Sequence, residues 1–446
     1  MSRRRFVVLI ACGAALFGLA LAGVQFQQRD DLNGFLVVTG LQAAIYLIAV
    51  WLVWNAAGSR RAALTIAVLA IAMRVPVVFA PPYLSADVYR YIWDGRIEAA
   101  GFNPYRYEPV DPQLAALRDA DIFPQIGSPY APTIYPPAAE AIFLIVTRVS
   151  ESATAMKLAM VAFEAVTVAL LVRLLMLEGL PATWFLVYAW HPLALWEFAG
   201  SGHIDAALIT FCVGALFAVR RDREGLAGFF ASAATLIKFY PLVLLPALYR
   251  RWDWRLPLVF LVSVVIAYSP FMSAGRGVLG FLPGYARQEG LNGQGAGFYL
   301  LGLLRRLPGL DGLDAKIYVI AAIVALGALS VGLMFRRDSQ QPPYAMAAVL
   351  AVAFTIAVSP HYPWYFAWLI VFACFLRSLA LLWLTNACLL LYLMTEHGVA
   401  PSTARLTIET TLYGLFGTLA LVDLWYYRRR ATRHGLEELG HVAWRK

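Results

Sequence analysis

Charged residues are scarce in this sequence: they make up 14% of its 446 residues, whereas about a quarter is usual in a soluble domain. Cysteine is scarce too, and the four cysteines lie inside apolar runs with no Cys-x-x-Cys spacing. Neither a P-loop nor a His-Glu-x-x-His motif occurs. The sequence therefore excludes a soluble enzyme, and the cysteines are expected to be small core residues rather than parts of a disulfide framework or a zinc site.

Histidine is also rare, with six residues that are too scattered along the chain to predict a metal centre. No cofactor is expected. A divalent cation stays an alternative, because Asp87, Asp94 and Asp205 offer the oxygen ligands that such an ion prefers and could converge in the fold.

Apolar residues are abundant, at 61% of the chain with a mean hydropathy of +0.67. Apolar stretches of about 15 to 25 residues recur from end to end, and about 20 residues cross the hydrocarbon core of a bilayer as a helix. The chain is therefore predicted to be one polytopic helical domain in a lipid bilayer. Its net charge of +9 lies in short basic clusters between apolar runs, which is how membrane proteins are oriented, so no nucleic-acid partner is expected.

The first apolar run, residues 6–24, follows three arginines and has a possible signal-peptide cleavage site at Ala20–Ala22. Its apolar core is longer than the usual length of about 7 to 15 residues, so an uncleaved first helix is preferred. Further spans are predicted at residues 35–56, 62–80, 154–176, 183–199, 204–219, 256–273, 316–335, 343–358, 362–376, 379–394 and 407–427.

The stretch 225–249 differs from the other spans because basic clusters flank it on both sides, at 220–223 and 250–255. Both flanks are expected to be cytoplasmic, so the stretch is predicted to form a re-entrant hairpin. The hairpin is expected to turn at Lys238–Pro241, where proline cannot continue a straight helix. With the hairpin counted as two short helices, about fourteen membrane segments result, and both termini are cytoplasmic.

Residues 81–135 form a predicted external loop that is rich in acidic and aromatic side chains. It is far longer than the connections of about 2 to 8 residues that are usual in helix bundles, so it is expected to be functional. A short helix is predicted within it, from the N-cap Ser85 to a stop at Gly101. Spacing places four polar side chains on one face of this helix: Asp87, Tyr91, Asp94 and Glu98.

Further external junctions are predicted at 200–205, 274–297 and 359–365, and the apolar run after Tyr135 is too short to span and is expected on the outer surface. Lys238 at the hairpin apex faces the same side. Carboxylates, histidines, one lysine and many tyrosines thus gather on the external side, while the other side holds basic anchors.

The predicted domains follow this topology. They are N-terminal helices at 1–80, an external catalytic loop with surface helices at 81–153, a core bundle at 154–376, C-terminal helices at 377–427 and a basic cytoplasmic tail at 428–446.

Several motifs follow one another between about residue 80 and about residue 370. They are Asp87-x-Tyr89, Gly101-x-Asn103-Pro-Tyr105, Tyr135-Pro-Pro, His191-Pro-Leu, Gly202-His-Ile-Asp205, Lys238-Phe-Tyr240-Pro241 and Ser359-Pro-His361-Tyr362. In their order and spacing the chain resembles the GT-C membrane glycosyltransferases, specifically the polyprenyl-phosphate-mannose-dependent mannosyltransferases of the phosphatidylinositol-mannoside and GPI-anchor type. Two features depart from that pattern: the two spans before residue 62 look additional, and the family's acidic pair is here Asp87 alone.

The resemblance implies an all-α, GT-C-like helical bundle in the inner (plasma) membrane. It further implies an inverting transfer of a sugar, expected to be mannose, from a polyprenyl-phosphate donor to a lipid or glycan acceptor on the external face. Asp87 would be the catalytic base. The residues expected to bind substrate are Tyr91, Asp94, Asn103, His203, Asp205, Lys238, Tyr240, Arg287, His361 and Tyr362.

Structural roles compete with these assignments. Asp87 could simply favour a helix start through the macrodipole, Asp94 could pair with Arg90 on its own helix, and Lys238 could extend its amine to the interface.

A function of another class is a lipid-linked saccharide flippase or secondary transporter. It is motivated by the ionisable residues within or near spans, which are Arg74, Glu164, Glu197 and Lys238. Transporters commonly have paired repeats, and no matching halves occur here. The gathering of reactive groups on one side beside a long loop favours the enzyme.

Overall fold

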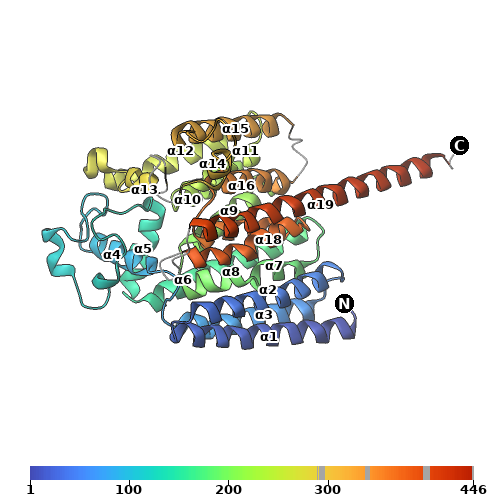
Figure 1. Ribbon diagram of the computed structural model, residues 1–446, viewed down its shortest axis with the longest axis horizontal. Helices are drawn as coiled ribbons and strands as arrows, with labels where there is room; N and C mark the ends of the chain where they lie inside the picture. Colours follow the sequence, from blue (N-terminus) through green and yellow to red (C-terminus); the bar gives the residue numbers. More distant parts are fainter. Residues whose placement is uncertain (289, 291–296, 337–341, 395–401, 444–446) are drawn as a thin grey trace.

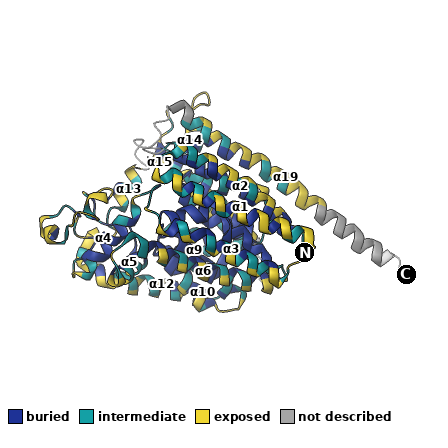
Figure 2. Cartoon of the chain, turned by 90° about the horizontal axis from the view of Figure 1, so that it is seen from below, coloured by how far each residue is buried: buried dark blue, intermediate teal, exposed yellow. Residues whose placement is uncertain are grey.

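The computed structural model describes residues 1–288, 290, 297–336, 342–394 and 402–443, and over these residues it contains helices but no strand. The start of α1 (Arg3–Gln28) and the end of α19 (Ser402–Ala443) lie at one end of the molecule, while α4 (Asp87–Ala99) and α5 (Pro137–Val149) project at the opposite end (Figure 1). Buried residues concentrate in the middle of the bundle, and exposed ones lie on its outer helices (Figure 2).

Six helices among the described residues are long and apolar enough to cross a bilayer. They are α1 (Arg3–Gln28), α2 (Leu32–Trp54), α3 (Arg60–Phe79), α6 (Ala153–Leu177), α12 (Arg255–Tyr268) extended by the turn η6 (Ser269–Gly277), and α15 (Ala315–Arg336). The protein is therefore an all-α polytopic membrane protein, as the sequence predicts. The total number of spans and their sidedness stay predictions.

The first three helices form one layer along the bundle (Figure 1). Each begins behind a short polar residue whose side chain accepts a hydrogen bond from a backbone N–H of the first turn; these N-caps are Ser2, Asp31 and Ser59. Long apolar runs between clear caps explain why these helices were predictable.

The region after α3 contains α4, α5 and two short helices, η1 (Pro112–Leu117) and η2 (Phe123–Gln125). The predicted N-cap Ser85 is wrong by one residue. Ala86 occupies the cap position, and the Ser85 hydroxyl accepts a hydrogen bond from the Asp87 N–H at 3.2 Å. The predicted stop is confirmed: α4 ends before Gly101, whose φ of +87° suits glycine.

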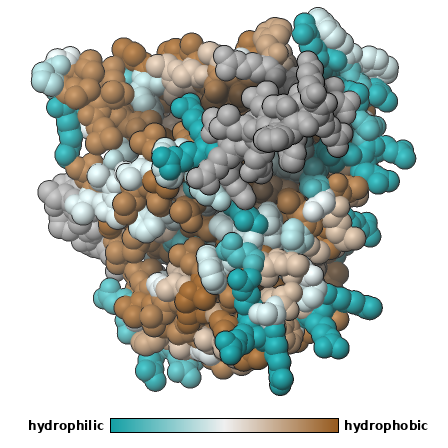
Figure 3. All heavy atoms as spheres, turned by 90° about the vertical axis from the view of Figure 1, so that its right-hand side faces the viewer, coloured by the Kyte–Doolittle hydropathy of each residue, from teal (hydrophilic) through white to brown (hydrophobic). Residues whose placement is uncertain are grey.

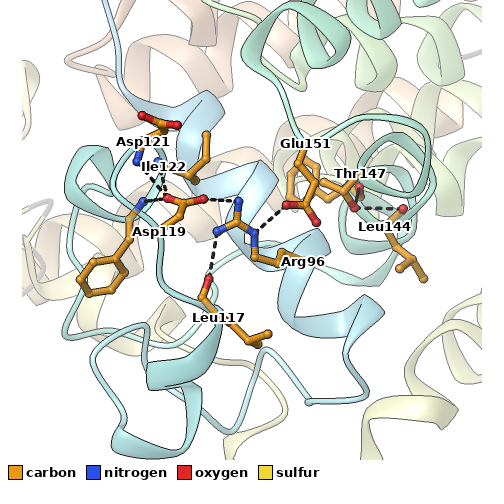
Figure 4. Close-up of polar contacts among 10 residues, drawn as sticks. Arg96, Leu117, Asp119, Asp121, Ile122, Leu144, Thr147 and Glu151 are labelled. Carbon is orange, nitrogen blue, oxygen red and sulfur yellow. Dashed lines mark hydrogen bonds and ion pairs between the residues drawn. The ribbon is translucent and has the colours of Figure 1, made fainter.

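Arg96 of α4 links several parts of the region between α3 and α6 (Figure 4). Its guanidinium reaches Asp119 at 2.5 Å, Glu151 at 2.8 Å and the Leu117 carbonyl at 3.0 Å. Gly95 beside it permits close packing, since a Cβ there would lie 2.5 Å from the Phe143 carbonyl oxygen of α5. The loop is therefore held against α4 and the start of α6.

The predicted span 183–199 is not one continuous helix. It consists of η3 (Ala182–Phe185), α7 (Leu186–Ala189), α8 (Pro192–Ala194) and the π-helical turn η4 (Leu195–Gly200). The break has a local cause: proline disfavours helical backbone in the residue before it, and His191 before Pro192 is extended, with ψ of 125°.

After this segment come α9 (Asp205–Arg220) and α10 (Glu224–Thr235), which pack against each other. The chain then turns through Lys238–Pro241 into the short helices η5 (Tyr240–Leu244) and α11 (Leu245–Leu248). The turn lies where proline predicted it, while its re-entrance into the membrane stays a prediction.

The remaining described helices complete the bundle. They are α13 (Leu282–Gln288), α14 (Tyr299–Leu304), α16 (Tyr344–Val358), η7 (Pro363–Leu369), α17 (Ile370–Ala373), α18 (Leu379–Ala387), η8 (Cys388–Met394) and α19 (Ser402–Ala443). The predicted tail therefore continues α19 as a helix to Ala443, and residues 444–446 lie outside the described residues. At the end from which α19 projects, hydrophilic side chains surround a largely hydrophobic surface (Figure 3).

Two of the ionisable residues that suggested transport form a buried ion pair. Arg74 of α3 contacts both carboxylate oxygens of Glu164 on α6, at 2.9 and 2.6 Å, and donates to the Ala189 carbonyl at 2.9 Å. Because each charge has a partner, the pair has a structural explanation as a link between the α3 layer and the central helices.

Candidate active site

Asp87 stands at the first turn of α4, and its side chain is 37% exposed. Its Oδ2 lies 3.7 Å from Nδ1 of His203, which comes from the turn before α9. Burial by the surrounding groups raises the pKa of the Asp87 carboxyl, the positive charge of Lys238 opposes that rise, and the negative charge of Asp205 adds to it. Asp87 is thus an accessible carboxylate beside three other ionisable groups.

Lys238, Asp205 and Tyr240 form one hydrogen-bonded group. Lys238 Nζ donates to Asp205 Oδ2 at 2.6 Å, and the Tyr240 hydroxyl donates to Oδ1 at 2.9 Å. Lys238 Nζ also lies 4.7 Å from the centroid of the Tyr365 ring. Asp205 is completely buried, so the lysine is paired with a carboxylate.

His203 lies between two carboxyl groups. Besides Asp87, it faces Glu197 of η4, whose Oε2 is 3.3 Å from Nε2 of the imidazole. The Tyr392 hydroxyl of η8 donates to the other Glu197 oxygen at 2.7 Å. Trp364 of η7 stacks on the imidazole, with 4.0 Å between ring centroids.

The π-helical turn is supported by the N-terminal helices. Trp196 donates its indole N–H to the Gln42 side chain of α2 at 2.8 Å. Gly23 of α1 leaves room for the Trp196 ring, since a Cβ there would lie 2.5 Å from it. The two helices that looked additional therefore hold the segment that carries Glu197.

His361 and Tyr362 lie beside the same cluster. Nε2 of His361 accepts a hydrogen bond from Arg405 of α19 at 2.7 Å. The ring of Tyr362 stacks on Trp364 at 4.6 Å. The site therefore combines the starts of α4, α9 and α19 with the turn around Lys238 and the loop before η7.

Asp94 belongs to a second cluster, between α4 and α5, and Tyr91 lies between that cluster and Asp87. Asp94 pairs with Arg90 at 2.8 Å, and Tyr91 is completely buried and stacked on Phe143 at 4.5 Å. Burial and the negative charge of Asp94 raise the pKa of Glu98 to about 7. The predicted polar face of α4 thus divides: Asp94 and Glu98 lie in the second cluster, whereas Asp87 faces His203 and Tyr91 lies close enough to Asp87 and Asp205 to feel both charges.

Asn103 and Arg287 also have local partners. The Asn103 amide donates to the Phe271 carbonyl and the Ser273 hydroxyl, at 3.1 and 2.9 Å. Arg287 is exposed on α13 and donates to the Pro283 carbonyl at 3.2 Å. Neither contact joins the His203 cluster.

Metal ligation has little support in the part of the chain that the structure describes, where no group of three His, Cys, Asp or Glu side chains is arranged to hold an ion. The convergence considered for Asp87, Asp94 and Asp205 does not occur, because Asp94 is engaged with Arg90 in the second cluster.

Sequence analysis gave no role in the site to four residues of the group around His203 and His361. Glu197 was noted only as an ionisable residue in an apolar run, while Tyr392 and Arg405 carried no signal, because each reaches the site from distant sequence. Trp364 lay in a predicted external junction without an assigned role.

The chain was compared with curated proteins and with models of protein families. No curated protein matches the chain. A family model does match, over residues 7–253, which is more than half of the sequence and includes both N-terminal helices. That model describes the N-terminal domain of alpha-(1->6)-mannopyranosyltransferases, the MptA_B family, and the chain belongs to this family of membrane mannosyltransferases.

Proposed function

We propose that the protein transfers mannose, with inversion, from a polyprenyl-phosphate-linked donor to a hydroxyl group of a lipid or glycan acceptor on the non-cytoplasmic face of the inner membrane. The observation that carries the proposal is Asp87, an accessible carboxylate at the start of α4 beside His203, Asp205 and Lys238. Family membership supports mannosyl transfer, and the site supports its chemistry.

The reaction needs one base and no strong acid. The carboxylate of Asp87 takes the proton of the acceptor hydroxyl while the acceptor oxygen bonds to the anomeric carbon. The bond from that carbon to the phosphate oxygen breaks, and the lipid phosphate leaves with the electron pair. A single displacement of this kind inverts the anomeric carbon.

Cations near the departing phosphate would stabilise its charge. Lys238 is one candidate, although Asp205 balances part of its charge. Arg405 is a second, since it is hydrogen-bonded to His361 and its side chain is 30% exposed, although Glu409 at 3.3 Å balances part of its charge. Tyr240 shares Asp205 with Lys238, Tyr362 follows His361 in the chain, and both would contact the donor.

The alternative of a flippase or transporter has lost its main support. Arg74 and Glu164 are paired with each other, and Glu197 and Lys238 belong to the cluster around His203 and Asp205. These positions favour the enzyme.

The decisive assay incubates purified protein with radiolabelled polyprenyl-phosphate-mannose and a membrane lipid extract. Label should move into a new glycolipid, and a nucleotide-linked mannose at the same concentration should give none. Transfer from the nucleotide sugar alone, or no transfer from either donor, would contradict the proposal.

Sidedness is tested by cysteine labelling. The four native cysteines are buried, whereas Gln113 in η1 is exposed. A membrane-impermeant maleimide should therefore label Gln113→Cys in intact spheroplasts. Trp252→Cys, at a position 82% exposed between α11 and α12, should react only after permeabilisation. The opposite pattern would overturn the external position of the loop.

A further inference from the structure

The imidazole of His203 connects a buried carboxyl group to an accessible one. Glu197 and His203 are completely buried, while the Asp87 side chain is 37% exposed. The two ring nitrogens face opposite ways, with Nδ1 toward Asp87 and Nε2 toward Glu197. Both ring nitrogens of His203 are buried without a hydrogen-bond partner among the described residues, so a proton on His203 or Glu197 changes what the imidazole presents to Asp87 across 3.7 Å.

The backbone fixes this arrangement. The His203 N–H donates to the Glu197 carbonyl at 3.0 Å, which closes the turn after η4. Gly202 makes the turn possible with a φ of +77°, where a Cβ would also approach the Lys157 side chain to 3.0 Å. Stacking on Trp364 then holds the plane of the imidazole. π-helical turns of this kind occur frequently at functional sites.

The numbers of hydrogen-bond donors and acceptors indicate how many protons His203 and its two neighbouring carboxyl groups hold. A neutral imidazole has one N–H and one lone pair, so it cannot donate to two carboxylates at once. If Asp87 and Glu197 were both ionised, the lone pair of the neutral imidazole would face a negative charge. One of the three groups therefore has to hold an additional proton. Glu197 is the group suited to carry that proton, because the ion pairs of the described residues give it no lysine or arginine partner. A buried carboxylate without a cation is costly.

Tyr392 fits this protonation state. Its hydroxyl donates to Oε1 of Glu197, which leaves Oε2 to carry the proton toward Nε2 of His203. Every donor in the series then points the same way: Tyr392 to Glu197, Glu197 to His203, and His203 to Asp87.

We propose that Glu197 is a protonated positioning residue, which fixes His203 as the Nδ1–H tautomer and thereby directs a neutral hydrogen-bond donor at Asp87. The inference rests on the proposed function of Asp87 as the base. One oxygen of Asp87 would be held by His203, and the other would be free to accept the proton of the acceptor hydroxyl. A neutral donor orients the carboxylate without the pKa depression that an imidazolium at the same place would cause.

The test compares Glu197→Gln with Glu197→Leu in the full-length protein, using radiolabelled polyprenyl-phosphate-mannose as donor. The amide of glutamine can accept from Tyr392 and donate to Nε2, as a protonated carboxyl does, so Glu197→Gln should retain kcat within a few-fold. Leucine does neither, so Glu197→Leu should lose about 10²-fold in kcat, the usual cost of a misplaced catalytic group, with little change in donor KM. Equal loss in both variants would overturn the proposal, because Glu197 would then act as an anion; full activity in both would overturn it as well.

A second pair of variants covers the case in which leucine prevents folding. In His203→Asn the amide nitrogen takes the approximate place of Nδ1, so it should retain part of kcat, whereas His203→Leu should lose about 10²-fold in kcat relative to wild type. Equal loss in both His203 variants, with folded protein, would contradict a donor at that position. Wild-type protein without transfer would overturn the proposed function and this inference together, whereas active wild type with inactive Glu197→Gln would overturn the inference alone.

Discussion

Asp87→Asn should remove nearly all transfer, lowering the rate by about 10² to 10⁴-fold. Asparagine keeps the shape of the side chain and one oxygen that can accept from His203, but it cannot take the proton of the acceptor hydroxyl. Donor binding should change little, since the described partners of Asp87 belong to the protein side of the site. Initial rates at saturating donor, together with a donor-binding measurement, check both parts.

Asp121→Asn is the matched control, because it makes the same exchange at an exposed position of the same region between α3 and α6. It should transfer at the wild-type rate. Near wild-type turnover by Asp87→Asn would make Asp87 a helix-start residue and direct attention to Asp205. Loss of donor binding rather than turnover would mean that Asp87 holds the sugar.

The raised pKa of Asp87 predicts the acid limb of the pH profile. The base acts only when ionised, so the rate should fall as pH decreases through the folded-state pKa. Because burial raises that pKa, the fall should begin at a higher pH than for an unperturbed aspartate, whose pKa is about 3.9. A rate that declines only near the pH of an ordinary aspartate would contradict the assignment.

Sequence patterns predicted the long helices better than the broken ones. An apolar run with a polar cap specifies a helix almost by itself, as in α1, α2 and α3. The segment from Ala182 to Gly200 depends on partners far away, among them Gln42 and Gly23, which hold Trp196. No local pattern contains that information, so hydropathy predicted one uniform span.

The residues of the site likewise fall into those that the sequence could predict and those that it could not. Motif resemblance indicated Asp87, His203, Asp205 and Lys238, and the structure brings these four together. The motif resemblance could not indicate Tyr392, because its hydrogen bond to Glu197 joins residues almost two hundred positions apart. Helical spacing put Asp94 and Tyr91 with Asp87. Tyr91 does lie near Asp87, although α5 covers its ring, whereas Asp94 is paired with Arg90. The positions of ionisable groups along one helix were thus predictable, and their partners on other helices were not.

Lys238→Ala should destabilise the protein by about 3 to 5 kcal/mol, because it leaves Asp205 completely buried without its cation. The apparent Tm in detergent, followed by intrinsic tryptophan fluorescence, should fall accordingly. Lys238→Arg keeps the charge and should retain more of the stability, although a guanidinium cannot reproduce the single 2.6 Å contact of the amine.

The double variant Lys238→Met, Asp205→Asn separates stability from catalysis. It removes both charges together, so no uncompensated ion stays buried, and most of the lost Tm should return. If Lys238 contacts the donor phosphate, the donor KM of the double variant should still be higher than that of the wild-type protein, because the methionine thioether carries no charge. A double variant with the wild-type donor KM would assign Lys238 to the structural pairing with Asp205 alone, and Arg405 beside His361 would then be the cation to test for the phosphate.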